Sequence, residues 1–328
     1  MRAVWYDRTG PAREVLVLGE RDKPAPGPRE VLISIRASGV NPSDAGMRGG
    51  RAGPMAYPRI TPNSDGAGVV EAVGTLVSPA LICKRVWFYN GQRNGRAFGS
   101  AAEYIELDAE LVRELPDAVG FAEGATLGIP AMTAHVCLFM AGPVQGRTVL
   151  VTGGAGAVGH YAVQLAKWAG ASVIATVSSA EKAARALAGG ADHVIDYRRE
   201  DVTARLTEIA GREGVDHVVD VDLGGNLVKV LPALKPGGSI AFYATRGDAT
   251  PSLPAGELMR RNLSVFGMVL PASAPERRRR AQDDVSRWIA TGERLLSVAS
   301  RHPLEDVAGA HEAVERGDKV GTVVVEIG

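Results

Sequence analysis

Alternating apolar and polar residues predict a β-rich segment over about the first 120 residues. Glycine and proline separate the strand-like runs, as in the Pro-rich turn Lys23–Pro28 that precedes one of them. The expected strands are Val31–Arg36, Gly68–Gly74, Arg85–Tyr89 and Ala102–Leu107. Short strands joined by long loops are typical of a small antiparallel barrel.

From Thr148 to Met268, strand-like runs alternate with helix-like segments. The expected strands are Thr148–Thr152, Ser172–Val177, His193–Asp196, His217–Val221, Ser239–Tyr243 and Leu263–Met268. Apolar residues recur at helical spacing after the first of them, from Val158 to Ala169, and a second helix is expected through Glu181 to Ala188. This order predicts an α/β domain with a doubly wound parallel sheet.

The C-terminal tail is too short for a third domain. It contains a charged helix from Pro275, then the segment His311–Glu315 and a strand at Thr322–Ile327. The charge run Glu276–Arg280 is expected on a solvated helix face. We expect the tail to return to the first domain, so that residues 1–121 and 269–328 form one domain and residues 122–268 an inserted second one.

Composition excludes several classes of protein. The chain has 328 residues, with 37 Lys and Arg balanced by 37 Asp and Glu, which argues against binding to nucleic acid or an acidic membrane. No run of about 18 apolar residues predicts a membrane span, and the start has no signal-peptide core. The two cysteines, Cys83 and Cys137, form no CxxC pair and are expected in the core. We therefore expect a soluble cytoplasmic protein.

A glycine-rich turn follows the first strand of the α/β segment. Residues 153–159 read GGAGAVG and contain G-x-G-x-x-G as Gly154, Gly156 and Gly159. The strand before it and the amphipathic helix after it are the context in which this pattern binds a dinucleotide. Glycine lets the backbone approach a pyrophosphate, whose charge rests on a helix N-terminus, and Ala157 and Val158 are further candidates for contacts there.

The end of the next strand favours NADP over NAD. NAD-binding folds place an acidic residue there for the ribose, whereas this chain has Ser178, Ser179 and then Lys182. Hydroxyls, a helix N-terminus and a lysine suit a 2′-phosphate. The same residues also allow an ordinary capping box from Ser178 to Glu181. Tyr197 and, more weakly, Lys319 are further candidates for contacts with the adenosine end.

Motifs spread along the whole chain resemble the medium-chain dehydrogenase/reductase superfamily, most closely its zeta-crystallin-like NADPH:quinone oxidoreductases. The matching stretches are Ala37–Asp44, Asn63–Gly74, Leu127–Ala134, Gly153–Gly159, His193–Tyr197, Leu234–Gly238 and His302–Asp306. The resemblance implies a GroES-like catalytic domain, a Rossmann domain that binds NADPH, and a homodimer paired through Leu263–Met268. It also implies cofactor contacts at Thr133, Asn226, Tyr243, Thr245 and Arg246.

The zinc-dependent branch of this superfamily holds its catalytic metal with two cysteines and one histidine. The corresponding positions are similar to Asn41, Ser64 and Leu127–Pro130, and none is Cys or His. The stretch Asn90–Arg96, where a structural-zinc lobe would lie, has no thiol. A hydride donor without a metal works best on an acceptor that is already electrophilic, such as a quinone or an α,β-unsaturated carbonyl.

Asn41 is the first candidate for a donor to the developing oxyanion, and Asp44 is expected to orient its loop. Turn formation by Asn-Pro and helix capping by Asp44 are the alternative interpretations. The family commonly has a tyrosine two residues after this aspartate, where the present chain has Gly46. Tyr57, Tyr89 or Tyr243 are the candidates to compensate.

The sequence thus predicts an NADPH-dependent, zinc-free reductase of quinones or related enones. It binds no nucleic acid and no membrane in this interpretation, and its partner is a small-molecule substrate. The alternatives are an enoyl-thioester reductase and a non-catalytic NADPH-binding protein of the crystallin kind. The absence of a tyrosine in Gly49–Ala52 disfavours the former, and the missing pocket tyrosine keeps the latter open.

Overall fold

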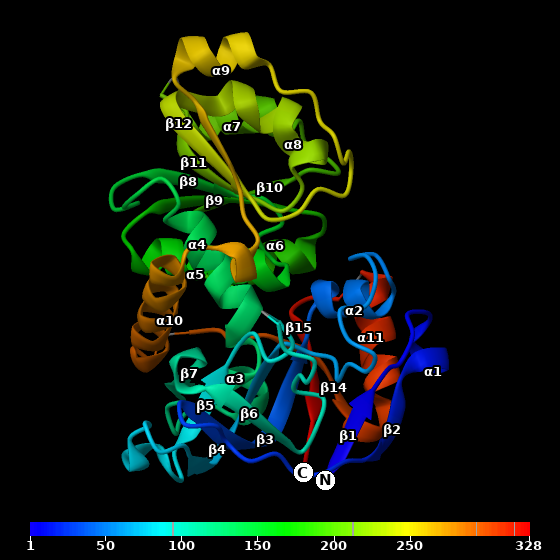
Figure 1. Cartoon of the computed structure of the whole chain (residues 1–328). Helices are drawn as coiled ribbons and strands as arrows, with labels where there is room; N and C mark the ends of the chain where they lie inside the picture. Colours follow the sequence, from blue (N-terminus) through cyan, green and yellow to red (C-terminus); the bar gives the residue numbers. More distant parts are fainter. Residues whose placement is uncertain (94, 212, 293, 318) are drawn as a thin grey trace. The chain divides into compact units, whose positions relative to one another are not determined.

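The computed structural model in Figure 1 describes residues 1–93, 95–211, 213–292, 294–317 and 319–328. Asn94, in the stretch Asn90–Arg96 considered above, lies outside the described residues. The chain forms two compact units. Unit 1 comprises Met1–Ile129, Gln282–Ala290 and Leu296–Gly328, and unit 2 comprises Pro130–Ala281 and Thr291–Leu295.

Unit 2 is built on a six-stranded parallel sheet with the order β10-β9-β8-β11-β12-β13. Figure 1 shows α4, α5 and α6 on one side of this sheet and α7, α8 and α9 on the other. The strands are β8 (Thr148–Val151), β9 (Ser172–Val177), β10 (His193–Asp196), β11 (Val215–Asp220), β12 (Leu234–Phe242) and β13 (Ser264–Gly267). The helices are α4 (Met132–Leu138), α5 (Ala157–Trp168), α6 (Ala180–Ala188), α7 (Val202–Ala210), α8 (Leu223–Val230) and α9 (Ala255–Arg261). The doubly wound sheet predicted from the sequence is confirmed.

Unit 1 contains a seven-stranded sheet ordered β14-β15-β3-β4-β5-β7, with β6 also paired to β3. The long strand β3 pairs with β6 through Glu30–Ser34 and with β15 through Ala37–Val40. Its strands are β3 (Glu30–Val40), β4 (Asp65–Val73), β5 (Arg85–Phe88), β6 (Tyr104–Asp108), β7 (Val112–Glu114), β14 (Val298–Pro303) and β15 (Thr322–Glu326). The tail strand β15 therefore completes the sheet that the N-terminal segment begins.

Short helices and a separate ribbon accompany this sheet. The ribbon joins β1 (Arg2–Trp5) and β2 (Val17–Glu20) in antiparallel pairing. The helices are α1 (Ala12–Val15), α2 (Pro42–Arg48), α3 (Phe121–Gly124) and α11 (Val307–Arg316), and the division between the units falls within α10 (Pro275–Ala290). The charge run at the start of α10 is largely exposed, as predicted.

Each unit has its own apolar core. In unit 1 the inward-facing residues of β3, such as Ile33 and Ile35, pack with residues of β5, β15 and α11. In unit 2, Leu150, Ile174 and Ile240 from neighbouring strands lie under helices of one face. No helix in the described part of the chain is long and apolar enough to cross a membrane.

Two expectations about unit 1 were wrong. Its sheet is not wholly antiparallel, because β14 and β15 run parallel. Cys83 is exposed rather than buried, whereas Cys137 is buried as expected. The reason is local: Cys83 lies in the turn before β5 with a φ of 65°, and its N–H is bonded to the carbonyl of Val70.

Candidate active site

The glycine-rich turn between β8 and α5, in unit 2, is shaped by two close approaches and by one residue with a positive φ. A Cβ on Gly159 would lie 2.2 Å from the carbonyl oxygen of Gly153, and one on Gly154 would lie 2.7 Å from the Ala175 Cβ. Gly153 itself has a φ of 64°, which favours glycine. These positions let α5 begin directly over the ends of β8 and β9. Packing alone therefore requires glycine at these positions.

The first turn of α5 offers free N–H groups at the end of the central strands. Gly156 is the N-cap residue with extended backbone, and Ala157 and Val158 open the twelve-residue helix. A Cβ on Gly156 would meet only the Gly153 carbonyl oxygen, at 3.3 Å. Unpaired N–H groups and the helix dipole together make such a terminus an anion site.

The end of β9 brings two hydroxyls and a lysine together. Lys182 Nζ donates to Ser178 Oγ at 3.0 Å, and the Lys182 backbone N–H donates to Ser179 Oγ at 3.3 Å. The residue that caps α6 is therefore Ser179, and the capping box proposed from Ser178 to Glu181 is wrong by one position. Extended backbone at Ser179 places its hydroxyl, rather than that of Ser178, over the helix start.

The other cofactor candidates of unit 2 lie around the ends of β10 and β12 and in α4. Thr133 is buried in α4, and Tyr197, directly after β10, is 46% exposed. Tyr243 follows β12, where its N–H donates to the Asp220 carbonyl at 3.1 Å. Thr245 donates its hydroxyl to the Asp248 carbonyl. Lys319 lies in unit 1, and its Nζ donates to the Gly321 carbonyl at 2.9 Å.

Two aspartates that the sequence analysis did not select organise the loops after β11 and β12. Asp220 is fully buried, and burial raises its pKa to about 6. It accepts hydrogen bonds from Thr152 Oγ1 at 3.3 Å and, weakly, from Asn226 Nδ2 at 3.5 Å. Asp222 Oδ1 accepts from the backbone N–H of Arg246 at 2.6 Å. Asn226 and Arg246 are thus held by neighbouring carboxylates at one edge of the sheet.

In unit 1, Asn41 and Asp44 form a buried pair at the start of α2. The Asn41 backbone N–H donates to Asp44 Oδ2 at 2.8 Å, and Pro42 occupies the first helical position. Asn41 Nδ2 donates to Asp65 Oδ2, also at 2.8 Å. Asp44 therefore acts on the backbone of Asn41, while a second carboxyl group, on Asp65, fixes its side chain. Asp65 was not among the site residues predicted from the sequence.

Asp65 is enclosed by backbone. A Cβ on Gly128 would lie 2.2 Å from Asp65 Oδ1, and a Cβ on Gly39 would lie 3.2 Å from the Asp65 Cβ. Its Oδ2 also accepts from the Ile129 N–H at 2.8 Å, whereas Oδ1 has no hydrogen-bond partner among the described residues. Burial, followed by the nearby charge of Asp44, raises the pKa of Asp65 well above its ordinary value. The buried Asp65 carboxyl group thus anchors the Asn41 carboxamide.

A buried arginine balances the charge of Asp44. Arg93 Nη2 lies 3.0 Å from Asp44 Oδ1, and both side chains are at least nine-tenths buried. Ser64 Oγ donates to the same Oδ1 at 2.8 Å. Within the described residues, no group of three or more His, Cys, Asp and Glu side chains is arranged to hold a metal ion. Asn41 and Ser64, two of the positions compared with zinc ligands, are hydrogen-bond donors to Asp65 and Asp44 in this structure.

Gly46 leaves room in α2. A Cβ at this position would meet only the Arg51 side chain, at 3.7 Å, which is an ordinary contact. Of the tyrosines considered as replacements, Tyr89 is 2% exposed and Tyr57 donates its hydroxyl to the Gly95 carbonyl. The missing tyrosine of the family pattern therefore corresponds to a small residue with space beside it.

His311, in α11, is bonded to Asn63 and gives a testable pH dependence. It is fully buried, its Nε2 donates to Asn63 Oδ1 at 3.0 Å, and burial lowers its pKa to about 3. The unfolded chain therefore binds a proton between about pH 6.5 and 3 that the folded chain does not. Each pH unit below 6.5 should cost up to about 1.4 kcal/mol of stability from this group.

We expect the urea midpoint to fall less steeply between pH 7 and 5 for His311→Gln than for the wild type. His193→Gln, at an exposed position in unit 2, is the control and should fall like the wild type. Asp65 acts with the opposite sign, because a raised folded pKa adds stability as the pH falls, and it is present in all three proteins. Equal slopes in His311→Gln and wild type would contradict the prediction.

Comparison with known proteins shows the family of the chain. The family model for the alcohol dehydrogenase GroES-like domain matches residues 27–117, and that for zinc-binding dehydrogenase matches residues 157–289. The quinone oxidoreductase of Homo sapiens is 30% identical over 318 residues, covering 97% of this chain and 94% of the relative. The chain belongs to the quinone oxidoreductase family of medium-chain dehydrogenases/reductases.

Solved structures of this fold cover the chain from end to end. A mycobacterial protein described as complexed with NADPH has 30% identity and a TM-score of 0.85, with both chains fully covered. A protein described as an NAD-dependent alcohol dehydrogenase has 29% identity and a TM-score of 0.87 over the same coverage. Members of the fold thus differ in cofactor and substrate, so the side chains described above must carry the functional argument.

Proposed function

We propose that this chain is an NADPH-dependent reductase that transfers hydride to quinones or related α,β-unsaturated carbonyls without a metal ion. The observation that carries the proposal is the replacement of zinc donors by the buried network around Asn41. Family membership and the mycobacterial NADPH complex support the choice of cofactor and reaction.

The residues of unit 2 fit NADPH. When bound, the cofactor supplies a hydride from its nicotinamide ring. In the proposal, Gly154, Gly156 and Gly159 let the first turn of α5 receive the pyrophosphate. Ser178 and Lys182 hold the 2′-phosphate, because a lysine already paired with a hydroxyl presents a cation beside the N-terminus of α6. The remaining predicted contacts are Ala157, Val158, Ser179, Thr133, Tyr197, Asn226, Tyr243, Thr245, Arg246 and Lys319.

Asn41 has the chemistry required of an oxyanion donor. One N–H of its carboxamide donates to Asp65, which fixes the plane of the group. In the proposal, the second N–H donates to the carbonyl oxygen of the substrate. A fixed donor stabilises negative charge on a carbonyl oxygen better than a mobile one, since it needs no reorganisation. Asp44 and Asp65 are positioning residues in this scheme. Reduction of a quinone then takes up the hydride and a proton from solvent to give the hydroquinone.

One of the two matching family models is described as zinc-binding dehydrogenase. The side chains at the corresponding positions of this chain do not suit a zinc ion. Asn41 Nδ2 and Ser64 Oγ are both committed as hydrogen-bond donors, to Asp65 and Asp44. Thiolate and imidazole are the usual ligands of zinc in dehydrogenases, and the matching positions hold neither. No step of the proposed reaction therefore depends on a Lewis-acidic metal.

One assay separates this function from its two rivals. NADPH oxidation is measured with 1,4-benzoquinone, with 9,10-phenanthrenequinone and with crotonyl-CoA. We expect turnover with the quinones. Turnover with the thioester alone would establish the enoyl-thioester reductase instead, and NADPH binding without turnover of any acceptor would establish the non-catalytic alternative.

Replacement of Lys182 tests the choice between NADPH and NADH. Lys182→Ala should raise the Kd of NADPH about tenfold, since one charge-assisted contact to the 2′-phosphate is lost, and leave the Kd of NADH unchanged. Lys229→Ala, at an exposed position of α8, is the matched control and should change neither. An equal loss for both cofactors would refute the 2′-phosphate assignment.

The domain boundaries and the homodimer belong to the same proposal. We assign residues 1–121 and 269–328 to the GroES-like catalytic domain and residues 122–268 to the Rossmann domain. Among the described residues, β13 is paired only with β12, so it is an edge of the parallel sheet that a second copy can cover. Light scattering should give twice the chain mass, and a monomer mass would oppose this assignment.

A further inference from the structure

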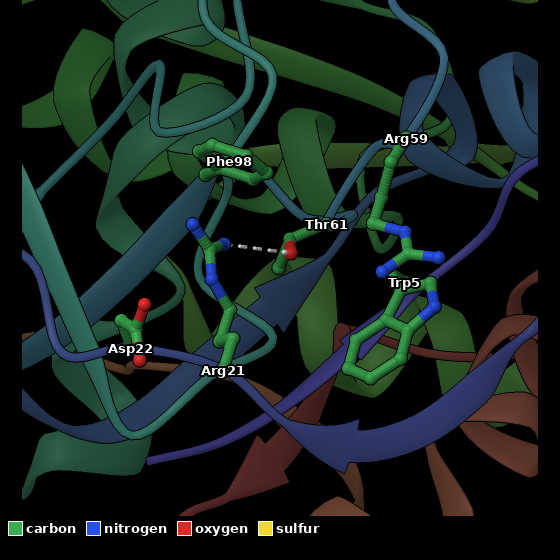
Figure 2. Close-up of a pocket in the computed structure, with 6 residues that line it drawn as sticks. All are labelled: Trp5, Arg21, Asp22, Arg59, Thr61 and Phe98. Carbon is green, nitrogen blue, oxygen red and sulfur yellow. Dashed lines mark hydrogen bonds between the residues drawn. The ribbon is translucent and has the colours of Figure 1, made fainter.

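A small pocket in unit 1 shares no lining residue with the network around Asn41. It has a volume of about 260 Å³ and is lined by Trp5, Arg21, Asp22, Arg59, Thr61 and Phe98. Figure 2 shows Arg21 beside Phe98 and Arg59 beside Trp5, with Thr61 between the two pairs. Ligand pockets for small molecules begin at about 300 Å³, so the volume suits a ligand of few atoms.

Backbone pairing holds the two walls in place. Tyr6 and Ile60 form an antiparallel bridge that sets Trp5 beside Arg59, and Thr61 and Phe98 form a parallel bridge on the other side. The indole of Trp5 occupies the space over Gly19, where a Cβ would lie 2.3 Å from the ring. The pocket is therefore preformed rather than dependent on a flexible loop.

The two guanidinium groups in the pocket differ in their charge partners. Arg59 Nε and Nη2 form two 2.7 Å bonds with the carboxylate of Asp7, so its charge is neutralised while its plane lies 4.7 Å from the Trp5 ring centroid. Arg21 stacks 3.6 Å from the Phe98 centroid, and a 3.4 Å bond to Thr61 Oγ1 is its hydrogen bond in the pocket. Among the described residues, no carboxylate oxygen lies within 4.0 Å of Arg21.

Arg21 is a partly buried cation that forms no direct ion pair within the part of the chain that the structure describes. Burial is the largest effect and lowers the pKa of Arg21; the charge of Glu106 is the next and raises it, while Arg59 and Asp22 act in opposite directions. An anion that bonds to the open edge of the guanidinium restores the interaction that burial removes. Asp22, which also lines the pocket, repels anions and so opposes a doubly charged ligand most, and the aromatic walls favour an apolar, flat one.

We propose that this pocket binds a small aromatic carboxylate carrying a single negative charge. The carboxylate pairs with the edge of Arg21 and accepts a hydrogen bond from the hydroxyl of Thr61. The ring of the ligand lies between the two aromatic–guanidinium stacks. This inference does not depend on the proposed enzymatic function, and its test uses no activity measurement.

Benzoate is the probe, with neutral benzamide and inorganic phosphate as comparison ligands, and binding to the full chain is measured by calorimetry. The indole N–H resonance of Trp5, assigned with Trp5→Phe because the chain has four tryptophans, reports binding at the site. We expect saturable benzoate binding that shifts this resonance, with no saturation by benzamide. Arg21→Gln should raise the benzoate Kd at least tenfold, and Arg21→Lys, which keeps the charge but loses the fork, should lie in between.

Arg29→Gln, at an exposed arginine of unit 1, is the matched control and should bind benzoate like the wild type. NADPH binding and thermal melting show that each variant is folded. The proposal is overturned if benzoate binds Arg21→Gln as tightly as wild type, or if no saturation is reached by about 10 mM. Tighter binding of phosphate than of benzoate would overturn the assigned ligand class.

Discussion

Asn41→Ala should lower kcat for quinone reduction about 100-fold, because the loss of one oxyanion donor typically costs a factor of 10² to 10³. The Kd of NADPH should stay the same, since Asn41 belongs to unit 1 and the proposed phosphate contacts belong to unit 2. The variant also leaves Asp65 Oδ2 with a single donor, from Ile129. A modest fall in melting temperature is therefore expected alongside the loss of turnover.

Ser38→Ala is the matched control for this structural effect. Ser38 is buried in unit 1, and its Oγ lies 2.8 Å from Ser100 Oγ and accepts a hydrogen bond from Asn63 at 2.9 Å. Its replacement should lower the melting temperature by a similar amount and leave kcat unchanged. If both variants lose turnover in proportion to their melting temperatures, Asn41 has a structural role only.

Gly159→Ala should raise the Kd values of NADPH and NADH equally and by at least about tenfold. The added Cβ would lie 2.2 Å from the Gly153 carbonyl oxygen and 3.1 Å from the Gly154 Cα, and both contacts are to backbone. Overpacking of this kind costs about 1–3 kcal/mol and displaces the start of α5, where the pyrophosphate is proposed to bind. Equilibrium titration of both cofactors measures the effect.

Gly256→Ala supplies the comparison for a glycine substitution within a helix of the same unit. Gly256 is exposed in α9, and a Cβ there would meet only the flexible end of the Arg260 side chain, at 3.3 Å. Cofactor affinity should be unchanged, and stability should rise slightly because alanine favours helix. Unaltered affinities in Gly159→Ala would exclude this turn as the pyrophosphate site.

The parallel sheet was predictable because its strands carry the signal in their own residues. The expected Ser172–Val177 and His193–Asp196 coincide with β9 and β10, since each is a short apolar run between turn residues. The ribbon of β1 and β2 was not predicted. Val17 and Leu18 are exposed apolar residues in β2, so the strand has no alternating pattern from which to infer it.

The candidate site was predictable only where local sequence defines it. Gly154, Gly156 and Gly159 follow a spacing that one loop determines. Asp65 and Arg93 were not found, because their significance arises from contacts with Asn41 and Asp44 across 24 and 49 positions of sequence. A carboxyl group at the start of a strand resembles any surface aspartate until tertiary structure buries it.

The pairing of β15 with β3 has a consequence for synthesis of the chain. The central strand of unit 1 is translated within the first 40 residues, whereas the partner of its Ala37–Val40 half is translated among the last. All strands of the unit 2 sheet lie within residues 148–267, so this sheet can form while the Ala37–Val40 half of β3 still lacks its partner β15. Nascent chains stalled before Thr322 should therefore be the species that chaperones protect and that aggregate when they are not protected.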